Sequence, residues 1–126
     1  LLSRRVYSIE RIKPLLVNAQ SCFKKLKLTN IISEFGDGFL GWPKLAPFDH
    51  MIITCAVKKI DDRLLNQIRV NGSCVVPIGK TKKQQRLIKI TIGNERHDDV
   101  WEDLGKVSFV PIISKKDWII FNVWEN

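Results

Sequence analysis

The stretch of sequence that decides the fold is residues 36–56, which read GDGFLGWPKLAPFDHMIITCA. It begins with Gly36-Asp37-Gly38, a loop that glycine allows to bend where larger side chains could not. It ends in a largely apolar run, residues 51–56, within a strand that we expect over residues 48–56. Because this run does not alternate with polar residues, it predicts a strand that helices cover on both faces.

On the amino-terminal side of this stretch, the pattern predicts a strand, a helix and a second strand. Residues 5–9 form a short run that ends in Glu10, as in a buried parallel strand with an acidic residue at its carboxyl edge. Apolar residues then recur at intervals of three and four over residues 12–26, and Pro14 falls within the first helical turn. Residues 31–35 predict the second strand, which leads into the glycine loop.

On the carboxyl-terminal side, the pattern predicts more strands and an antiparallel edge. A short helix is expected over residues 61–68, and Asn71-Gly72 predicts a turn into a strand at 73–78. Residues 85–92 and 106–113 favour β-structure and predict a hairpin-like antiparallel edge to the sheet. The aromatic tail after Ser114 has two interpretations, a further packed strand or an exposed patch that seeks a partner.

Alternating strands and helices indicate an α/β fold, which binds its ligands at the carboxyl ends of the parallel strands. Glu10 and Asp37 are both expected at that edge. A carboxylate there can accept hydrogen bonds from ribose hydroxyls, and a second one can accept from an adenine amino group. Taken alone, a strand-ending acid such as Glu10 is more often a helix cap or a salt-bridge partner, so both interpretations stay open.

Length and composition limit the class of protein. A chain of 126 residues makes one domain at most, and it shows neither an apolar stretch of membrane-spanning length nor a signal-peptide pattern, so a cytoplasmic protein without a membrane partner is expected. The net charge of +8 could indicate a nucleic-acid partner. The basic runs at 58–59, 80–83 and 115–116 fall in different predicted loops, so a solvated surface is the favoured interpretation.

The cysteines and histidines indicate no metal site and no disulfide framework. Cys22, Cys55 and Cys74 lie far apart, and neither histidine stands at a metal-ligand spacing from any of them. Cys55 and Cys74 sit inside apolar runs, which favours buried structural thiols over reactive nucleophiles. No catalytic Ser-His-Asp or Cys-His arrangement is found either.

Residues 36–49 resemble the signature of the protein-L-isoaspartate O-methyltransferases along their whole length. Residues 6–11, 75–79 and 107–112 look like that family's second, fifth and final substrate-facing strands, so the resemblance covers about residues 5–112. The one departure is Met51, where the family usually has isoleucine. The resemblance implies a partial S-adenosylmethionine-dependent methyltransferase fold, Rossmann-like, at 1–113, with a mostly parallel sheet and a tail at 114–126.

The resemblance also implies site residues. Glu10, with Arg11 beside it, would hold the ribose of S-adenosylmethionine, and Asp37 with Gly38 would hold its adenine. A second group would line the peptide cleft, largely through backbone groups, because a repair enzyme must accept many sequences around one abnormal β-linked aspartate; its members are Thr54, Phe109, Val110 and Ile112. For the last three, plain core packing is an equal alternative.

The implied reaction is methyl transfer to the free α-carboxylate of an isoaspartyl residue, and a carboxylate needs no strong general base. The family's central first strand and its glycine-rich loop would precede Leu1, so the sheet is expected to have a gap. An upstream segment could fill this gap, the two flanking strands could pair directly, or the chain could be an inactive fragment. The rival functions are a non-catalytic remnant that serves as an interaction module and a basic nucleic-acid-binding domain.

Overall fold

The structure is a computed structural model that describes residues 2–110 and, for the backbone alone, 121–125. Its elements are β1 (Arg5–Glu10), α1 (Lys13–Lys25), β2 (Ile31–Phe35), the short 3₁₀ helices η1 (Gly38–Leu40) and η2 (Pro43–Leu45), β3 (Phe48–Ile53), α2 (Asp62–Leu65), β4 (Ile68–Ile78), β5 (Gln85–Thr91), the 3₁₀ turn η3 (Arg96–Asp98), β6 (Val100–Val107) and β7 (Phe121–Glu125). No helix in the described part of the chain is long and apolar enough to cross a membrane.

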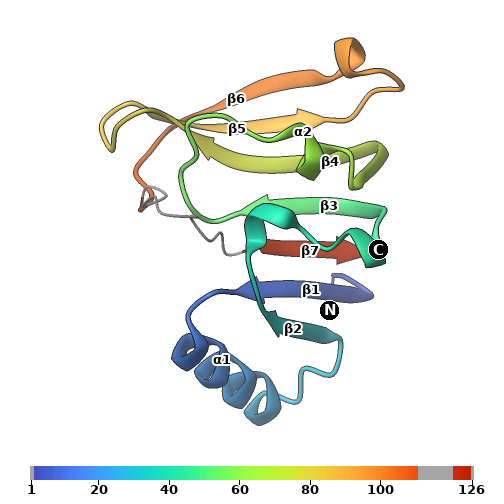
Figure 1. Ribbon diagram of the computed structural model, residues 1–126, viewed down its shortest axis with the longest axis vertical. Helices are drawn as coiled ribbons and strands as arrows, with labels where there is room; N and C mark the ends of the chain where they lie inside the picture. Colours follow the sequence, from blue (N-terminus) through green and yellow to red (C-terminus); the bar gives the residue numbers. More distant parts are fainter. Residues whose placement is uncertain (1, 111–120, 126) are drawn as a thin grey trace.

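The strands form one seven-stranded sheet in the order β2-β1-β7-β3-β4-β5-β6 (Figure 1). β1 runs parallel to β2, and β3 runs parallel to β4. β5 and β6 continue from β4 as antiparallel neighbours. The predicted α/β sheet and its antiparallel edge at this end of the chain are therefore confirmed.

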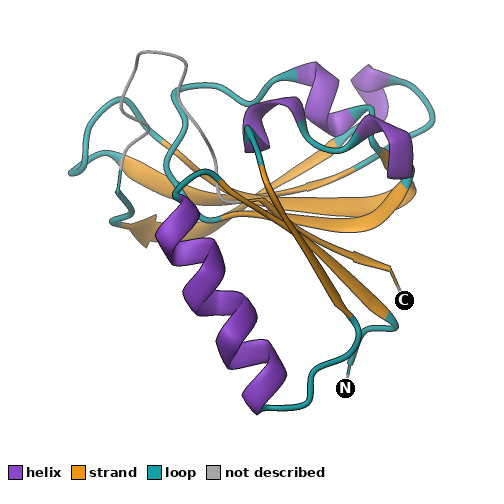
Figure 2. Cartoon of the chain, turned by 60° about the horizontal axis from the view of Figure 1, so that its bottom comes forward, coloured by secondary structure: helices purple, strands orange, loops and turns teal. Residues whose placement is uncertain are grey.

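The helices lie on opposite faces of the sheet (Figure 2). α1 packs on β1 and β2, where it buries Leu16 and donates a 3.1 Å hydrogen bond from Gln20 to Ser33. η1, η2 and α2 lie on the other face, over the main core, where the ring of Tyr7 contacts those of Trp42 and Phe48. The buried apolar residues of this core are Tyr7, Ile9, Phe48, Met51, Ile53, Val57, Ile60, Leu64, Leu65, Ile68, Cys74, Val76, Ile90 and Ile92.

The predicted turn at Asn71-Gly72 is wrong, because both residues lie inside β4. Asn71 has the left-handed φ of 65°, and the pairing of β3 with β4 shifts register between Phe48 and His50. A Cβ atom on Gly72 would stand 2.4 Å from the backbone oxygen of Asp49, so the irregularity brings the two backbones into close contact. The early start of β4 at Ile68 also shortens the helix expected at 61–68, which ends at Leu65.

The strand predicted at 106–113 is also displaced. β6 ends at Val107, and its pairing with β5 begins at Val100 opposite Thr91. Ser108 to Val110 continue past the strand, and residues 111–113 lie outside the described residues. Local β-propensity identified the segment, whereas the register of β5 determines which of its residues pair.

The gap expected at the centre of the sheet is filled in a way that the sequence did not suggest. No parallel strand lies between β1 and β3 among the described residues; β7 takes that position and pairs antiparallel with both. Of the two interpretations of the tail, a packed strand therefore holds for residues 121–125. Residues 114–120 and the predicted boundary at 113 lie outside the described residues, and that boundary stays a prediction.

Candidate functional site

Glu10 and the glycine loop lie together at the carboxyl ends of the neighbouring parallel strands β1 and β2. The backbone N–H of Gly36 donates to the carbonyl oxygen of Glu10 at 3.1 Å. The Glu10 side chain is buried, 9% exposed, and its Oε1 accepts from the N–H of Ile12 at 2.8 Å. Glu10 thus helps to order the turn into α1, while Arg11 lies half-buried in that turn.

Asp37 caps the short helix η1, because its Oδ1 accepts from the N–H of Phe39 at 2.9 Å. This contact leaves Asp37 half-buried and places the buried Gly38 at the start of η1. A cavity of about 150 Å³ borders Asp37. It is lined by Ile9, Glu34, Gly36, Asp37, Leu40, Gly41 and Trp42.

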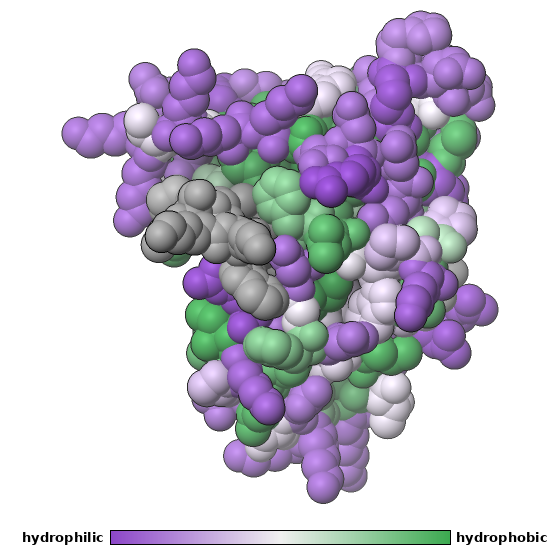
Figure 3. Space-filling model, in the orientation of Figure 1, coloured by the Kyte–Doolittle hydropathy of each residue, from purple (hydrophilic) through white to green (hydrophobic). Residues whose placement is uncertain are grey.

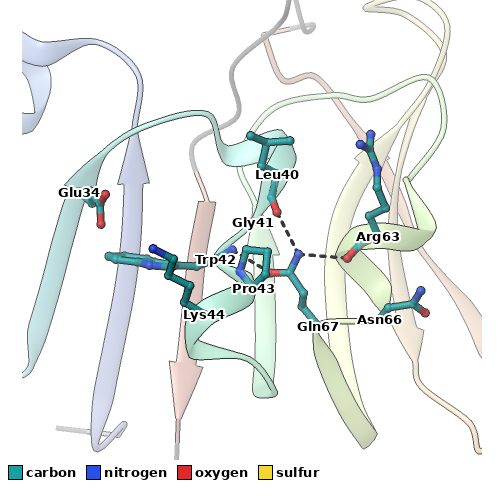
Figure 4. A pocket seen from close by; sticks show the side chains of 9 residues that line it. All are labelled: Glu34, Leu40, Gly41, Trp42, Pro43, Lys44, Arg63, Asn66 and Gln67. Atoms are coloured by element: carbon teal, nitrogen blue, oxygen red, sulfur yellow. Dashed lines mark hydrogen bonds between the residues drawn. The ribbon is translucent and has the colours of Figure 1, made fainter.

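A larger, open cavity of about 690 Å³ adjoins this one (Figure 4). It shares Glu34, Leu40, Gly41 and Trp42 with the smaller cavity and adds Pro43, Lys44, Arg63, Asn66 and Gln67. The loop from residue 36 to 42 therefore forms a common wall between a small cavity beside Asp37 and a wider one beside α2.

Gln67 fixes the position of that wall, a role that no sequence pattern indicated. The side chain is 6% exposed, and its Oε1 accepts from the N–H of Trp42 at 2.8 Å. Its Nε2 donates to the carbonyl oxygens of Leu40 at 3.0 Å and Arg63 at 3.1 Å. Figure 4 shows these hydrogen bonds converging on one amide group, which ties the loop to the end of α2.

Gly41 is the residue that this amide requires. Its φ of 63° lies in the left-handed region that favours glycine. A Cβ atom there would stand 2.3 Å from Oε1 of Gln67, so a side chain would displace the amide. No local pattern could have revealed the pair, because Gln67 follows Trp42 by 25 residues.

A second glutamine holds the segment that the sequence assigned to the substrate. Gln85, which is 1% exposed, donates from Nε2 to the carbonyl oxygen of Phe109 at 3.0 Å and accepts from the N–H of Phe109 at 2.6 Å. The carbonyl oxygen of Val110 accepts from the N–H of Ala56 at 3.1 Å. The structure therefore brings Phe109 and Val110 beside the segment that follows β3.

Thr54 lies half-buried in that segment, directly after β3, so it is close along the chain to Ala56. The side chain of Val110 is 66% exposed, whereas Phe109 is half-buried. Plain core packing therefore does not describe Val110. Ile112, the fourth residue expected in the peptide cleft, lies outside the described residues.

The two groups of predicted site residues share one edge of the sheet but do not adjoin. β1, β2 and β3 run in the same direction, so Glu10, Asp37 and Thr54 all follow the carboxyl ends of strands (Figure 1). The amino end of β7 lies between them, because Phe121 is in register with Ile9 on one side and Ile53 on the other. The residues predicted to bind the nucleoside therefore lie on one side of β7, and those predicted to bind the peptide lie on the other.

The cysteines have different surroundings. Burial raises the pKa of the Cys74 thiol to about 12, so this side chain stays protonated near neutral pH. Cys55 is half-buried, which departs from the buried thiol expected there, and Cys22 is exposed on α1. No group of three or more metal-ligating side chains occurs among residues 2–110.

The lysine-rich loops lie nearer to one another than the sequence suggested. Val57 accepts from the N–H of Gly79 at 2.9 Å, which brings the loop with Lys58 and Lys59 next to the loop that begins at Lys80. The lysine side chains of both loops are exposed, and hydrophilic side chains cover the second loop at the upper left of Figure 3.

Comparison with known proteins assigns the family. The family model described as protein-L-isoaspartate(D-aspartate) O-methyltransferase matches residues 2–117. A protein-L-isoaspartate O-methyltransferase of Cereibacter sphaeroides is 40% identical over 112 residues, which are 89% of this chain and 50% of the relative. One of Aliivibrio salmonicida is 44% identical over 110 residues, 86% of this chain and 50% of the relative. The chain thus spans about half the length of these curated relatives.

Solved structures agree on the fold. A protein-L-isoaspartate O-methyltransferase aligns with a TM-score of 0.76 at 22% identity, over 86% of this chain and 34% of that one. A putative protein-L-isoaspartate O-methyltransferase of Plasmodium falciparum, in complex with S-adenosyl-L-homocysteine, aligns with a TM-score of 0.70 at 22% identity, over 85% and 51% of the two chains. The sheet is therefore part of a Rossmann-like methyltransferase fold, and the chain belongs to the protein-L-isoaspartate(D-aspartate) O-methyltransferase family.

Proposed function

We propose that residues 1–126 form the nucleoside-binding and peptide-binding part of an enzyme that methylates the α-carboxylate of isoaspartyl residues in damaged proteins. One observation carries this proposal: two carboxylates, Glu10 and Asp37, lie at the carboxyl ends of adjacent parallel strands. Gly36 links them through its hydrogen bond to Glu10, and a cavity opens beside Asp37. Ligands of open α/β sheets bind at this edge.

The residues present fit the nucleoside of S-adenosylmethionine. A carboxylate offers about four lone-pair positions, so the backbone contacts of Glu10 and Asp37 leave further acceptor capacity. Glu10 would accept from ribose hydroxyls, with Arg11 beside it, and Asp37 with Gly38 would hold the adenine. When bound, the cofactor supplies the methyl group.

The peptide side suits a substrate that is recognised through its backbone. Gln85 fixes both backbone polar groups of Phe109, and Ala56 fixes the carbonyl group of Val110. A segment fixed in this way could align a peptide without selecting its side chains, because the carbonyl oxygens of Phe109 and Val110 each keep a second lone pair that can accept from a peptide N–H. We therefore assign Thr54, Phe109 and Val110 to the peptide cleft, and Ile112, which lies outside the described residues, stays a predicted fourth member.

The chemistry requires orientation more than proton transfer. The α-carboxylate of the substrate is ionised near neutral pH, so the protein need not remove a proton from it. The role of the named side chains is to bind and orient two reactants, which can lower a barrier by about 7 to 11 kcal/mol when the alignment is good. No catalytic base is assigned in this chain.

Titration calorimetry with S-adenosylhomocysteine tests the nucleoside site. Glu10→Gln and Asp37→Asn keep an acceptor for the backbone caps but remove the charge, and a hydrogen bond to a charged group contributes about 1.5 to 3 kcal/mol. Each variant should therefore bind at least about tenfold more weakly than the unchanged chain. The control is Glu102→Gln, an exposed residue of β6 that is ion-paired with Lys89. Equal affinities in all four proteins would remove both carboxylates from the site.

The second candidate function is a non-catalytic interaction module, and β7 is the observation that favours it. A sheet whose centre is already closed by β7 can persist without a glycine-rich cofactor loop. Cofactor binding separates the two candidates: a chain that gives no heat with S-adenosylhomocysteine, alone or completed by the rest of a relative, favours the module.

A further inference from the structure

Five exposed lysines, which we call the lysine surface, lie on two loops that the sheet brings together: Lys58, Lys59, Lys80, Lys82 and Lys83. The first loop follows Val57 and the second follows Gly79, and the N–H of Gly79 donates to the carbonyl oxygen of Val57 at 2.9 Å. A second hydrogen bond of 2.9 Å, from the N–H of Val57 to Pro77, completes this parallel pairing. The two loops therefore leave the sheet side by side.

The second loop has a compact shape that its own backbone contacts hold. The N–H of Gln84 donates to the carbonyl oxygen of Thr81 at 3.0 Å, so Lys82 and Lys83 occupy the tip of a hydrogen-bonded turn. The ends of the loop are in close contact, because a Cβ atom on Gly79 would stand 2.5 Å from the backbone oxygen of Gln84. The loop projects from the carboxyl end of β4 (Figure 1), and hydrophilic side chains cover it (Figure 3). Its lysines are therefore presented from a defined backbone.

No carboxylate in these loops offsets the charge of the lysine surface. Residues 54–60 and 77–85 contain all five lysines and neither aspartate nor glutamate. The nearest acid along the chain is Asp61, and its hydrogen bonds with Arg63 chiefly lower its pKa, with a smaller coulombic effect of Lys59. None of the five lysines forms an ion pair within the part of the chain that the structure describes. The lysine surface therefore offers positive charges that an acidic partner can neutralise.

Both loops border the segment that we assigned to the peptide cleft. Just before the first loop, the N–H of Ala56 donates to the carbonyl oxygen of Val110 at 3.1 Å. At the end of the second loop, the side chain of Gln85 binds both backbone polar groups of Phe109. Neighbouring strands are about 4.8 Å apart, so the two loops and this segment lie within roughly 10 to 15 Å of one another. The lysine surface therefore flanks the place that a bound peptide would occupy.

We propose that the lysine surface binds acidic side chains on either side of the methylated residue, so that this chain favours isoaspartyl sites in acidic stretches of polypeptide. The inference rests on the proposed function, and it adds a preference by charge to recognition through the peptide backbone. An extended peptide rises by about 3.3 Å per residue, so roughly three to five residues beside the methylated one come within reach of the lysines. Lysine is a flexible point charge, so it attracts carboxylates without requiring one exact sequence.

The surroundings of the lysine surface favour a polypeptide over a nucleic acid. Neither loop contains an aromatic residue on which a base could stack. Between the loops, the carbonyl oxygens of Phe109 and Val110 can accept from a peptide N–H. Phosphate groups are acceptors only, so they cannot pair with these oxygens. A polypeptide therefore satisfies both the lysines and the backbone between them, whereas a nucleic acid satisfies the lysines alone.

Fluorescence anisotropy with labelled peptides of equal length tests the preference. Each peptide carries a central isoaspartyl residue flanked by glutamate, glutamine or lysine, and one more carries an ordinary aspartyl residue between glutamates. The glutamate-flanked isoaspartyl peptide should bind at least about fivefold more tightly than the glutamine-flanked one at low salt, because several weak exposed ion pairs add. This difference should vanish at about 1 M salt, where charges are screened beyond about 3 Å. Equal affinities for these two peptides at low salt would overturn the proposal. Equal affinities for the isoaspartyl and ordinary aspartyl peptides between glutamates would instead contradict the proposed function and leave the lysine surface supported.

Charge reversal locates the contact. Lys58→Glu with Lys82→Glu changes one lysine in each loop, so the lysine-flanked peptide should then bind more tightly than the glutamate-flanked one. The matched control, Lys24→Glu with Lys25→Glu, makes the same change in net charge at exposed positions at the end of α1, away from both loops, and should keep the preference of the unchanged chain (Figure 1). An unaltered preference in the first variant, or the same reversal in both, would overturn the proposal. A DNA duplex that carries the same charge as the glutamate-flanked peptide and binds more tightly would also overturn it, because the lysines would then form a nucleic-acid surface.

Discussion

Replacing Gln67 with leucine removes the amide that ties the loop at 40–42 to α2, while keeping a side chain of similar size. The change leaves the N–H of Trp42 and the carbonyl group of Leu40 without their partner beside the open cavity, where Gln67 is buried, Trp42 is half-buried and Leu40 is 56% exposed. An unsatisfied group costs about 1 to 3 kcal/mol when it is buried, and less where water can reach it. The free energy of unfolding should therefore fall by about 1 to 3 kcal/mol, a substantial part of the 5 to 15 kcal/mol that is typical of a domain.

Urea unfolding followed by far-ultraviolet circular dichroism measures this change. The matched control is Gln84→Leu, because Gln84 lies exposed in the loop before β5 and should alter the free energy by less than about 0.5 kcal/mol. A Gln67→Leu protein that unfolds within that same range of the unchanged chain would refute the role of the amide as a clamp.

A double-mutant cycle with Gly41 sharpens the test. Gly41→Ala forces a Cβ atom against Oε1 of Gln67, whereas in a Gln67→Ala background the same substitution meets no amide. The loss in free energy of unfolding caused by Gly41→Ala should thus be smaller, by about 0.5 to 3 kcal/mol, in the Gln67→Ala protein than in the unchanged chain. An equal loss in both proteins would show that the left-handed φ of residue 41, and not contact with the amide, causes the destabilisation.

Two other buried side chains give further expectations. Gln85→Leu should lower the free energy of unfolding by about 1 to 3 kcal/mol and speed the amide exchange of Phe109, measured by mass spectrometry; an unchanged exchange rate would contradict the clamp. Because burial raises the pKa of Cys74 from an ordinary 9.0 to about 12, the folded state holds this proton more tightly, and stability should fall as pH rises from about 9 to 12. At pH 8, a thiol reagent should label the exposed Cys22 and leave Cys74 unlabelled until the chain unfolds.

Sequence patterns located the parts of the site that depend on local information. An apolar run with an acid at its end is sufficient to predict β1 and to place Glu10 at its carboxyl edge. The glycine loop follows β2 as predicted, because glycine and aspartate favour turns wherever they occur. Both carboxylates proved to cap backbone groups, which was the alternative interpretation of Glu10 and does not exclude ligand binding.

The features that sequence analysis missed depend on contacts between distant segments. Gln67 and Gln85 look like ordinary polar residues until the folded chain brings backbone groups 24 or more residues away against them. The start of β4 and the bounds of β6 are set by register with neighbouring strands rather than by propensity. A packed strand in the tail was one of two interpretations, but its place between β1 and β3 was not foreseen, because that place depends on pairing with two strands more than 65 residues away.

Methyl transfer by a completed protein tests the central claim most directly. Residues 1–126 are joined behind the part of the Cereibacter sphaeroides relative that precedes its matched segment, and transfer of a labelled methyl group to an isoaspartyl peptide is compared with transfer to the ordinary aspartyl peptide. The completed protein should methylate the isoaspartyl peptide selectively, at least about a thousandfold faster than residues 1–126 alone, because roughly half of the alignment energy would otherwise be lost. Two results would contradict this claim: a completed protein that folds but does not methylate the isoaspartyl peptide, or robust selective turnover by residues 1–126 alone.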